Sequence, residues 1–192
     1  MKEISLNGTL RTDLGKKASR EIRKQDLVPC VIYGVEKDEK GFPVAKSFTV
    51  TNKELAKLLY TPNVYIVNLS LDGKPVKAIL KALQTDFVTD RPLHVDFYQI
   101  TDNKPVVMEI PIKLNGLAEG VKAGGKLVQM MRKLKVQGIY TAFPDRINID
   151  VTELGLGKKI AVEDVKIEGL KFVNPADACV AEVKATRQSK QA

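Results

Sequence analysis

Short strand-like runs separated by turn signals are the feature that most constrains the fold of the first hundred residues. Six runs rich in β-branched and aromatic residues follow one another at short intervals. They are residues 4–10, 28–33, 47–50, 64–71, 76–83 and 93–100. So many short strands in so little chain predict a strongly curved, closed antiparallel sheet with two or three helices.

Two local signals mark the ends of elements within this half. Asp72-Gly73 separates two strand runs by two residues, which predicts a type I′ hairpin because both central positions need positive φ. Thr51 and Glu54 form a capping-box pattern that predicts a helix over residues 53–60. Thr61-Pro62 then ends this helix.

The polar, turn-rich residues 101–105 predict a domain boundary. Strand patterns continue beyond it at residues 106–114, 126–140, 147–151, 159–167 and 178–185. We therefore predict a mainly β (α+β) fold: an N-terminal β-barrel with short helices followed by a C-terminal β-rich domain. The predicted bounds are 1–100 for the barrel, 101–186 for the second domain and 187–192 for a polar tail.

A dense basic cluster occupies residues 11–24, where six cationic and two acidic side chains leave a net charge of +4. Four cations would share one side of a short helix bracketed by Gly15 and Asp26. They are Lys16, Arg20, Arg23 and Lys24. Such a face attracts a phosphate backbone, but many charge runs are only solvated faces. Charge alone leaves both interpretations open.

Composition narrows the class of protein. The net charge of +8 favours an anionic partner. No apolar run reaches the length of a membrane span and the N-terminus lacks a signal-peptide pattern, which predicts a cytoplasmic protein without membrane contact. Cys30 and Cys179 lie in apolar, strand-like contexts typical of reduced core thiols. With one histidine in the chain, we expect no metal site and no cofactor.

Enzyme motifs are mostly absent, which favours a non-enzymatic protein. Residues 120–127 are glycine-rich and basic, but they lack the Ser/Thr and the helix of a phosphate loop. A tight β-turn connection is the better interpretation.

The strand around His94 has two distinct faces. Alternation puts Leu93, Val95 and Phe97 on one face and the polar side chains His94, Asp96 and Tyr98 on the other. The polar set fits a solvated face, a hydrolytic base with its orienting carboxylate, or an RNA-reading surface. The segment alone favours the solvated face. The hydrolytic interpretation lacks a recognisable nucleophile in the sequence.

Three ordered motifs resemble a known family. Residues 15–34, GKKASREIRKQDLVPCVIYG, and residues 91–100, RPLHVDFYQI, resemble the bacterial ribosomal protein family that binds 5S ribosomal RNA and includes the general stress protein Ctc. Residues 116–127, GLAEGVKAGGKL, are similar to a motif of its long, two-domain members. Asp26 stands where many members have glycine, and residues 36–42 look like an insertion.

The resemblance implies an RNA-binding barrel and a constituent of the large ribosomal subunit in the cytoplasm. By position, it implies RNA contacts at Arg11, Lys16, Ser19, Arg20, Arg23, Tyr33, Gln84, His94 and Asp96. Neighbouring ribosomal proteins would be the partners of the C-terminal domain. A stress-linked, ribosome-associated adaptor whose C-terminal domain binds protein is the alternative function.

Overall fold

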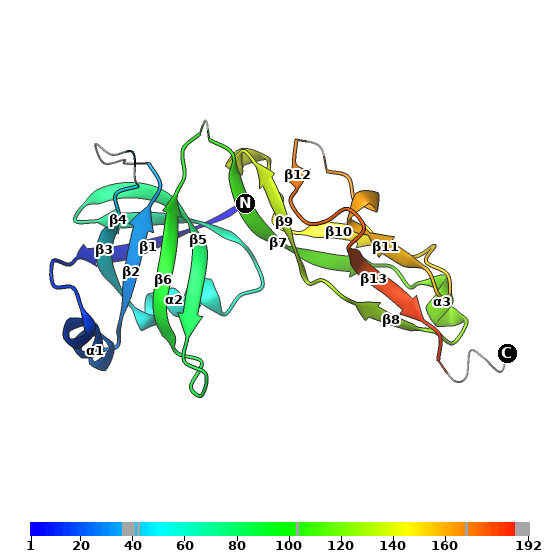
Figure 1. Ribbon diagram of the computed structural model, residues 1–192, viewed down its shortest axis with the longest axis horizontal. Helices are drawn as coiled ribbons and strands as arrows, with labels where there is room; N and C mark the ends of the chain where they lie inside the picture. Colours follow the sequence, from blue (N-terminus) through cyan, green and yellow to red (C-terminus); the bar gives the residue numbers. More distant parts are fainter. Residues whose placement is uncertain (36–40, 42, 103, 168, 187–192) are drawn as a thin grey trace. The chain divides into compact units, whose positions relative to one another are not determined.

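The computed structural model describes residues 1–35, 41, 43–102, 104–167 and 169–186. The chain divides into two compact units, Met1–Lys104 and Pro105–Ala192 (Figure 1). Of the inserted segment 36–42 only Gly41 is among the described residues, and the tail 187–192 lies outside them. The predicted mainly β fold, with an N-terminal barrel and a β-rich C-terminal half, is confirmed.

The N-terminal unit is a closed barrel of six strands in the order β1-β3-β2-β6-β5-β4. Its strands are β1 (Lys2–Leu10), β2 (Leu27–Tyr33), β3 (Lys46–Thr51), β4 (Tyr65–Leu71), β5 (Lys74–Thr85) and β6 (Pro92–Gln99). Helix α1 (Lys16–Lys24) precedes β2, and helix α2 (Asn52–Leu59) follows β3. All six strand runs predicted from the sequence are confirmed.

The prediction of an antiparallel sheet is wrong for two of the six strand pairs of the barrel. Strand β1 pairs with β4 in parallel, and β2 pairs with β6 in parallel. Turn signals identify only strands joined by short connections, such as β4 and β5, and these are antiparallel. Both parallel pairs join strands far apart in the sequence, where no local pattern encodes direction.

The two local signals of this unit are confirmed. Asp72 has φ 47° and Gly73 has φ 82°, both positive as the two-residue hairpin requires. The Thr51 side chain accepts a hydrogen bond from the Glu54 backbone N–H at 3.4 Å and caps α2. The helix thereby presents Leu55 and Leu58 to the barrel core.

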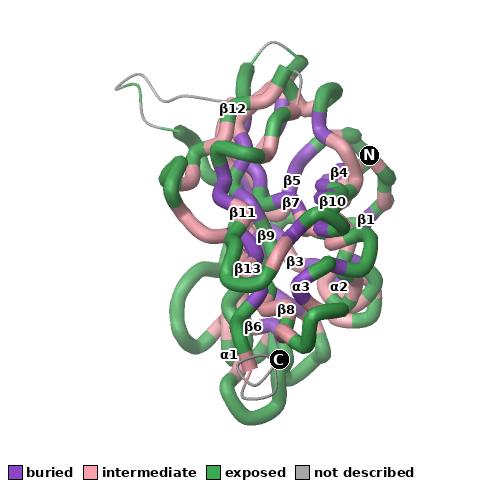
Figure 2. Tube along the Cα trace, turned by 90° about the vertical axis from the view of Figure 1, so that its right-hand side faces the viewer, coloured by how far each residue is buried: buried purple, intermediate pink, exposed green. Residues whose placement is uncertain are grey.

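The barrel interior is fully apolar among the described residues. Phe48 and Phe97 are wholly buried, with ring centroids 5.8 Å apart. Figure 2 shows buried residues along the strands and exposed ones in the turns. A continuous core of this kind makes the barrel a rigid support for the side chains on its outer surface.

The C-terminal unit has two sheets, ordered β10-β7-β9-β12 and β11-β13-β8. The strands are β7 (Val106–Asn115), β8 (Lys126–Gln129), β9 (Lys133–Gly138), β10 (Ile147–Asp150), β11 (Lys159–Ala161), β12 (Lys171–Phe172) and β13 (Cys179–Lys184). Three short helical turns complete the unit: α3 (Glu119–Lys122), η1 (Tyr140–Ala142) and η2 (Val162–Asp164).

Two predictions for this unit need correction. The run 126–140 is not one strand, because residues 130–132 are not part of a strand. The segments on either side, β8 and β9, belong to different sheets. The glycine-rich segment 120–127 is not a simple β-turn, since α3 occupies its start. A Cβ on Gly120 would lie 2.7 Å from the Gly155 carbonyl carbon, and one on Gly125 would lie 2.6 Å from the Gly120 oxygen. Close backbone packing therefore explains these glycines.

None of the helices in the described part of the chain is long and apolar enough to span a lipid bilayer. Among the described residues, the free cysteines are Cys30, which is buried, and Cys179, which is half-buried. Cys30 is the core thiol expected from the sequence, whereas Cys179 is only partly enclosed.

Cys30 should report on opening of the barrel. Burial is the main cause that raises the pKa of its thiol to about 12, from an ordinary value of 9.0. At pH 9 the folded protein therefore keeps this thiol protonated, while the unfolded chain ionises about half of it. In a Cys179→Ser variant we expect alkylation at pH 9 to be slow in buffer and fast in denaturant, as measured by mass spectrometry. Rapid alkylation of the folded variant would contradict the burial.

Candidate nucleic-acid interface

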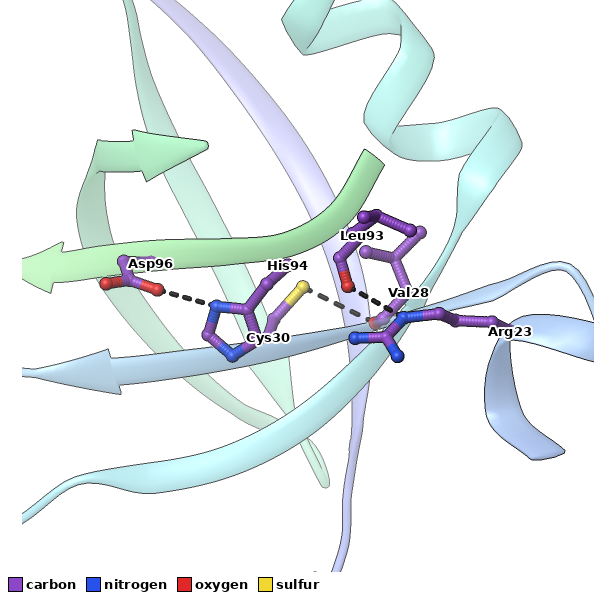
Figure 3. Close-up of polar contacts among 6 residues, drawn as sticks. All are labelled: Arg23, Val28, Cys30, Leu93, His94 and Asp96. Atoms are coloured by element: carbon purple, nitrogen blue, oxygen red, sulfur yellow. Dashed lines mark hydrogen bonds and ion pairs between the residues drawn. The ribbon is translucent and has the colours of Figure 1, made fainter. Parts of the chain in front are cut away.

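Strand β6 presents a polar pair on the outside of the barrel. His94 Nδ1 lies 2.8 Å from Asp96 Oδ1, with both side chains partly exposed at 24% and 32% (Figure 3). Val95 and Phe97 point into the core with no exposed surface, which confirms the predicted alternation. Leu93 differs from the prediction, since it is only half-buried near the start of the strand.

The contact with Asp96 fixes the imidazole of His94. In the neutral ring with its hydrogen on Nδ1, the Nδ1–H donates a hydrogen bond to the Asp96 carboxylate. The other ring nitrogen, Nε2, is then an acceptor on the far side of the ring. If the ring is protonated, Nε2 becomes a donor instead. In both protonation states, His94 Nε2 and Asp96 Oδ2 are held in place and can bond to an external partner.

Neighbouring strands extend this polar surface. Gln84 of β5 is the cross-strand partner of His94, so the exposed amide and the imidazole lie side by side. On the other side, Tyr33 of β2 is the partner of Tyr98. Their rings meet edge to face, with centroids 5.9 Å apart. Burial, and then the negative charge of Asp96, raise the pKa of the Tyr33 hydroxyl, which keeps it a neutral donor.

Gly34 allows the chain to leave β2 beside these rings. Its φ of 137° is one that L side chains rarely adopt. A Cβ at this position would lie 3.0 Å from both the Gln99 carbonyl oxygen and Tyr98 Cε2. Glycine here preserves the position of Tyr98 at the edge of the polar surface.

Helix α1 is tied to the same strand by Arg23. The Arg23 Nε donates a hydrogen bond of 3.0 Å to the Leu93 carbonyl oxygen, next to His94 (Figure 3). The helix has no buried residue, and Lys16 and Arg20 are exposed on it at the predicted spacing. This bond therefore places a cationic helix beside the polar pair, although the two segments are 70 residues apart.

A second contact joins Arg11, just after β1, to Ser19 of α1. Arg11 Nη1 donates to Ser19 Oγ at 3.5 Å, and the Arg11 backbone N–H donates to the Ser47 carbonyl at 3.0 Å. The Arg11 Nε is buried and has no hydrogen-bond partner among the described residues. Arg11 is half-buried, and its enclosed Nε and its hydrogen bond to Ser19 hold the side chain in place, which suits a charged group that contacts a phosphate.

The backbone at Asp26, just after α1, suits the glycine that the family resemblance implies for many members. Asp26 has φ 58°, in the left-handed region that glycine favours and aspartate tolerates. The Asp26 carboxylate accepts a hydrogen bond of 3.2 Å from the Asn52 amide, and the backbone of Asn52 donates to the Asp26 carbonyl at 3.0 Å. The helix exit therefore keeps the conformation expected of glycine.

The structure brings most of the predicted contact residues onto two adjoining surfaces. We define the polar face as Gln84, His94 and Asp96 with Tyr33 at its edge, and the cationic helix as α1 with Arg11. Sequence reasoning omitted Tyr98 from the predicted contacts although alternation had placed it beside Asp96. Tyr98 lies beside Tyr33 because β2 and β6 pair in parallel, and no local sequence pattern predicts that pairing.

Catalytic or metal chemistry finds no support at this face. Cys30 lies on the neighbouring strand, but its thiol is buried, donates to the Val28 carbonyl at 3.5 Å and stays protonated because of its raised pKa. It is therefore a poor nucleophile. Across the residues that the structure describes, no three His, Cys, Asp or Glu side chains are grouped to hold a metal ion.

Comparison with known proteins identifies the family. Residues 6–97 match the Ribosomal L25p family, and residues 105–187 match the C-terminal domain of ribosomal protein TL5. The chain belongs to the ribosomal L25p family. It has the long form with both domains, and this family consists of structural proteins that are not enzymes.

Curated relatives match along the whole chain. A large ribosomal subunit protein bL25 from Phocaeicola vulgatus is 55% identical over 192 residues, covering 100% of this chain and 97% of that protein. Proteins of the same name from Bacteroides thetaiotaomicron and Porphyromonas gingivalis are 47% and 48% identical, with the same coverage. Such high identity over the full length extends the L25p assignment to both units.

Proposed function

We propose that this L25p protein is a structural constituent of the large ribosomal subunit and that its barrel binds 5S ribosomal RNA. Its curated relatives are named as proteins of that subunit, which supports a ribosomal role in the cytoplasm. The observation that most supports RNA binding is the Arg23–Leu93 bond, since it puts the cationic helix next to His94 and Asp96.

The cationic helix and the polar face would make different kinds of contact with the RNA. Lys16, Arg20 and the half-buried Arg11 would neutralise phosphates and set the orientation of the RNA without reading its sequence. The polar face would supply fixed donors and acceptors to base edges and ribose hydroxyls. Asp96 can accept from base amines or 2′-hydroxyls, while Gln84 can both donate and accept.

The geometry favours RNA with an irregular helix. In regular A-form RNA the major groove is too deep and narrow for side chains to read the bases. Side chains on the outside of a barrel therefore reach base edges most easily at a loop, a bulge or a widened groove. We propose that the bound part of 5S RNA has such a feature.

Co-sedimentation tests the ribosomal assignment. In lysates of cells in ordinary growth, fractionated on sucrose gradients, we expect the protein in stoichiometric amounts with free large subunits and whole ribosomes. The hydrogen bonds proposed for the polar face depend less on salt than phosphate contacts do, so they should hold the protein there through a moderate salt wash. A protein found mainly at the top of the gradient, and joining subunits only under stress, would indicate the adaptor function instead.

A further inference from the structure

The four-stranded sheet of the C-terminal unit has a basic outer face. Along β7 and β9 buried residues alternate with exposed ones, so one side of the sheet packs inward and the other meets solvent. The exposed side carries lysines from three strands. They are Lys113 of β7, Lys133 and Lys135 of β9, and Lys171 of β12.

Strand register places these lysines on the same side of the sheet. Lys135 faces Glu109, and Lys133 faces Pro111, which is two residues from Lys113. Lys171 faces Gln137, which is two residues beyond Lys135 on β9. Since facing residues and residues two apart share a face, the four lysines form one array, which we call the lysine face.

The four lysines of the face outnumber its acids, which are Glu109 and Asp150. The Lys135 ammonium is 3.9 Å from Glu109, and both side chains are more than half exposed, so solvent screens this pair strongly. Lys113, Lys133 and Lys171 make no ion pair with any residue that the structure describes. Asp150 of β10 also lies on this side, because it faces Asn115, two residues from Lys113, and its carboxylate accepts a hydrogen bond from the Thr152 backbone N–H at 2.9 Å. Glu119, Glu153 and Glu163 lie outside the strands of this sheet.

We propose that the lysine face is a second RNA-binding surface, which contacts the phosphate backbone without reading sequence. Lysine is depleted in protein–protein interfaces, whereas ammonium groups in register suit a run of phosphates. The remaining outward residues include Gln137 and Asn148, which can donate to phosphate or ribose oxygens. Ile139 and Val173 are about half exposed and continue the alternation of Gln137 and Lys171, but neither is an aromatic or arginine anchor of the kind that dominates protein interfaces. This surface is additional to the 5S-binding surface proposed for the barrel.

The test uses the full chain with the cationic helix weakened, so that the second surface can be measured. The background variant carries Lys16→Gln, Lys17→Gln and Arg20→Gln, all at exposed positions of α1. The probe is a fully paired RNA duplex of arbitrary sequence, titrated at several salt concentrations. Added to this background, the test set is Lys113→Gln, Lys133→Gln and Lys171→Gln. The matched control set removes the same charge from the exposed Lys126, Lys158 and Lys159 of the same unit.

We expect the test set to lower duplex affinity about tenfold or more at low salt. It should also reduce the slope of log affinity against log salt by about 2 to 3, since three phosphate contacts are lost. The control set should change both quantities much less. Equal losses in the two sets would show a general charge effect and overturn the proposal, as would no loss in either. Binding of 5S RNA by the wild-type chain is measured separately, so failure of the barrel's proposed function would be seen on its own.

Discussion

Replacing His94 or Asp96 with alanine is expected to weaken binding of 5S RNA while leaving the barrel as stable as the wild type. Both side chains lie outside the core, and the inward neighbours Val95 and Phe97 are unchanged. If each side chain makes the proposed hydrogen bond to RNA, its replacement should cost about 1–3 kcal/mol, or roughly 5- to 150-fold in affinity. Removing Asp96 also frees the imidazole to rotate, so part of the loss for Asp96→Ala should come through His94.

Affinity and melting temperature measured on the same two variants distinguish the possible roles of the pair. A solvated face would leave both quantities unchanged, and that result would remove the polar face from the interface. Gln129→Ala provides a matched control, because this exposed amide lies in the C-terminal unit and should leave 5S affinity as it is.

Removing charge from the cationic helix should have the other large effect. A variant with Lys16→Ala, Arg20→Ala and Lys24→Ala loses three exposed cations but keeps the Arg23–Leu93 bond that positions the helix. If each cation meets a phosphate, the salt slope of 5S binding should decrease by about 3. Affinity for transfer RNA should fall by a similar factor, since phosphate contacts carry no sequence information.

Lysines of the second helix are the control for this variant. Lys53 and Lys57 are exposed on α2, and their replacement by alanine changes net charge without touching α1. An affinity that is nearly independent of salt in the wild type would contradict the electrostatic part of the proposal. So would equal losses from the two helices, because they would show that only net charge matters.

The sequence was sufficient to predict the elements of the barrel because its signals are local. Alternation predicted the strands, Asp72-Gly73 the hairpin and Thr51 the helix cap. Strand alternation also separated His94 and Asp96 from the core, although it gave no reason to prefer RNA over water. That preference came from resemblance to a family.

What the sequence could not predict depends on contacts between distant residues. The parallel pairing of β2 with β6 brings Tyr33 to Tyr98, and the side chain of Arg23 reaches across 70 residues to Leu93. Lysines 113, 133 and 171 are likewise dispersed in the sequence and meet only through strand register. Periodicity reports which face a side chain occupies, but not which other strand lies beside it.

Equilibrium binding to 5S RNA and to transfer RNA at one salt concentration tests the central claim most directly. The titration uses the full chain and the fragment 1–100, the predicted extent of the barrel domain, whose folding is checked by circular dichroism. We expect both to bind 5S RNA more tightly than transfer RNA, on the order of tenfold or more, because the polar face adds specific contacts to the phosphate contacts. A folded fragment and a full chain that bind both RNAs equally would contradict the claim that the barrel recognises 5S RNA.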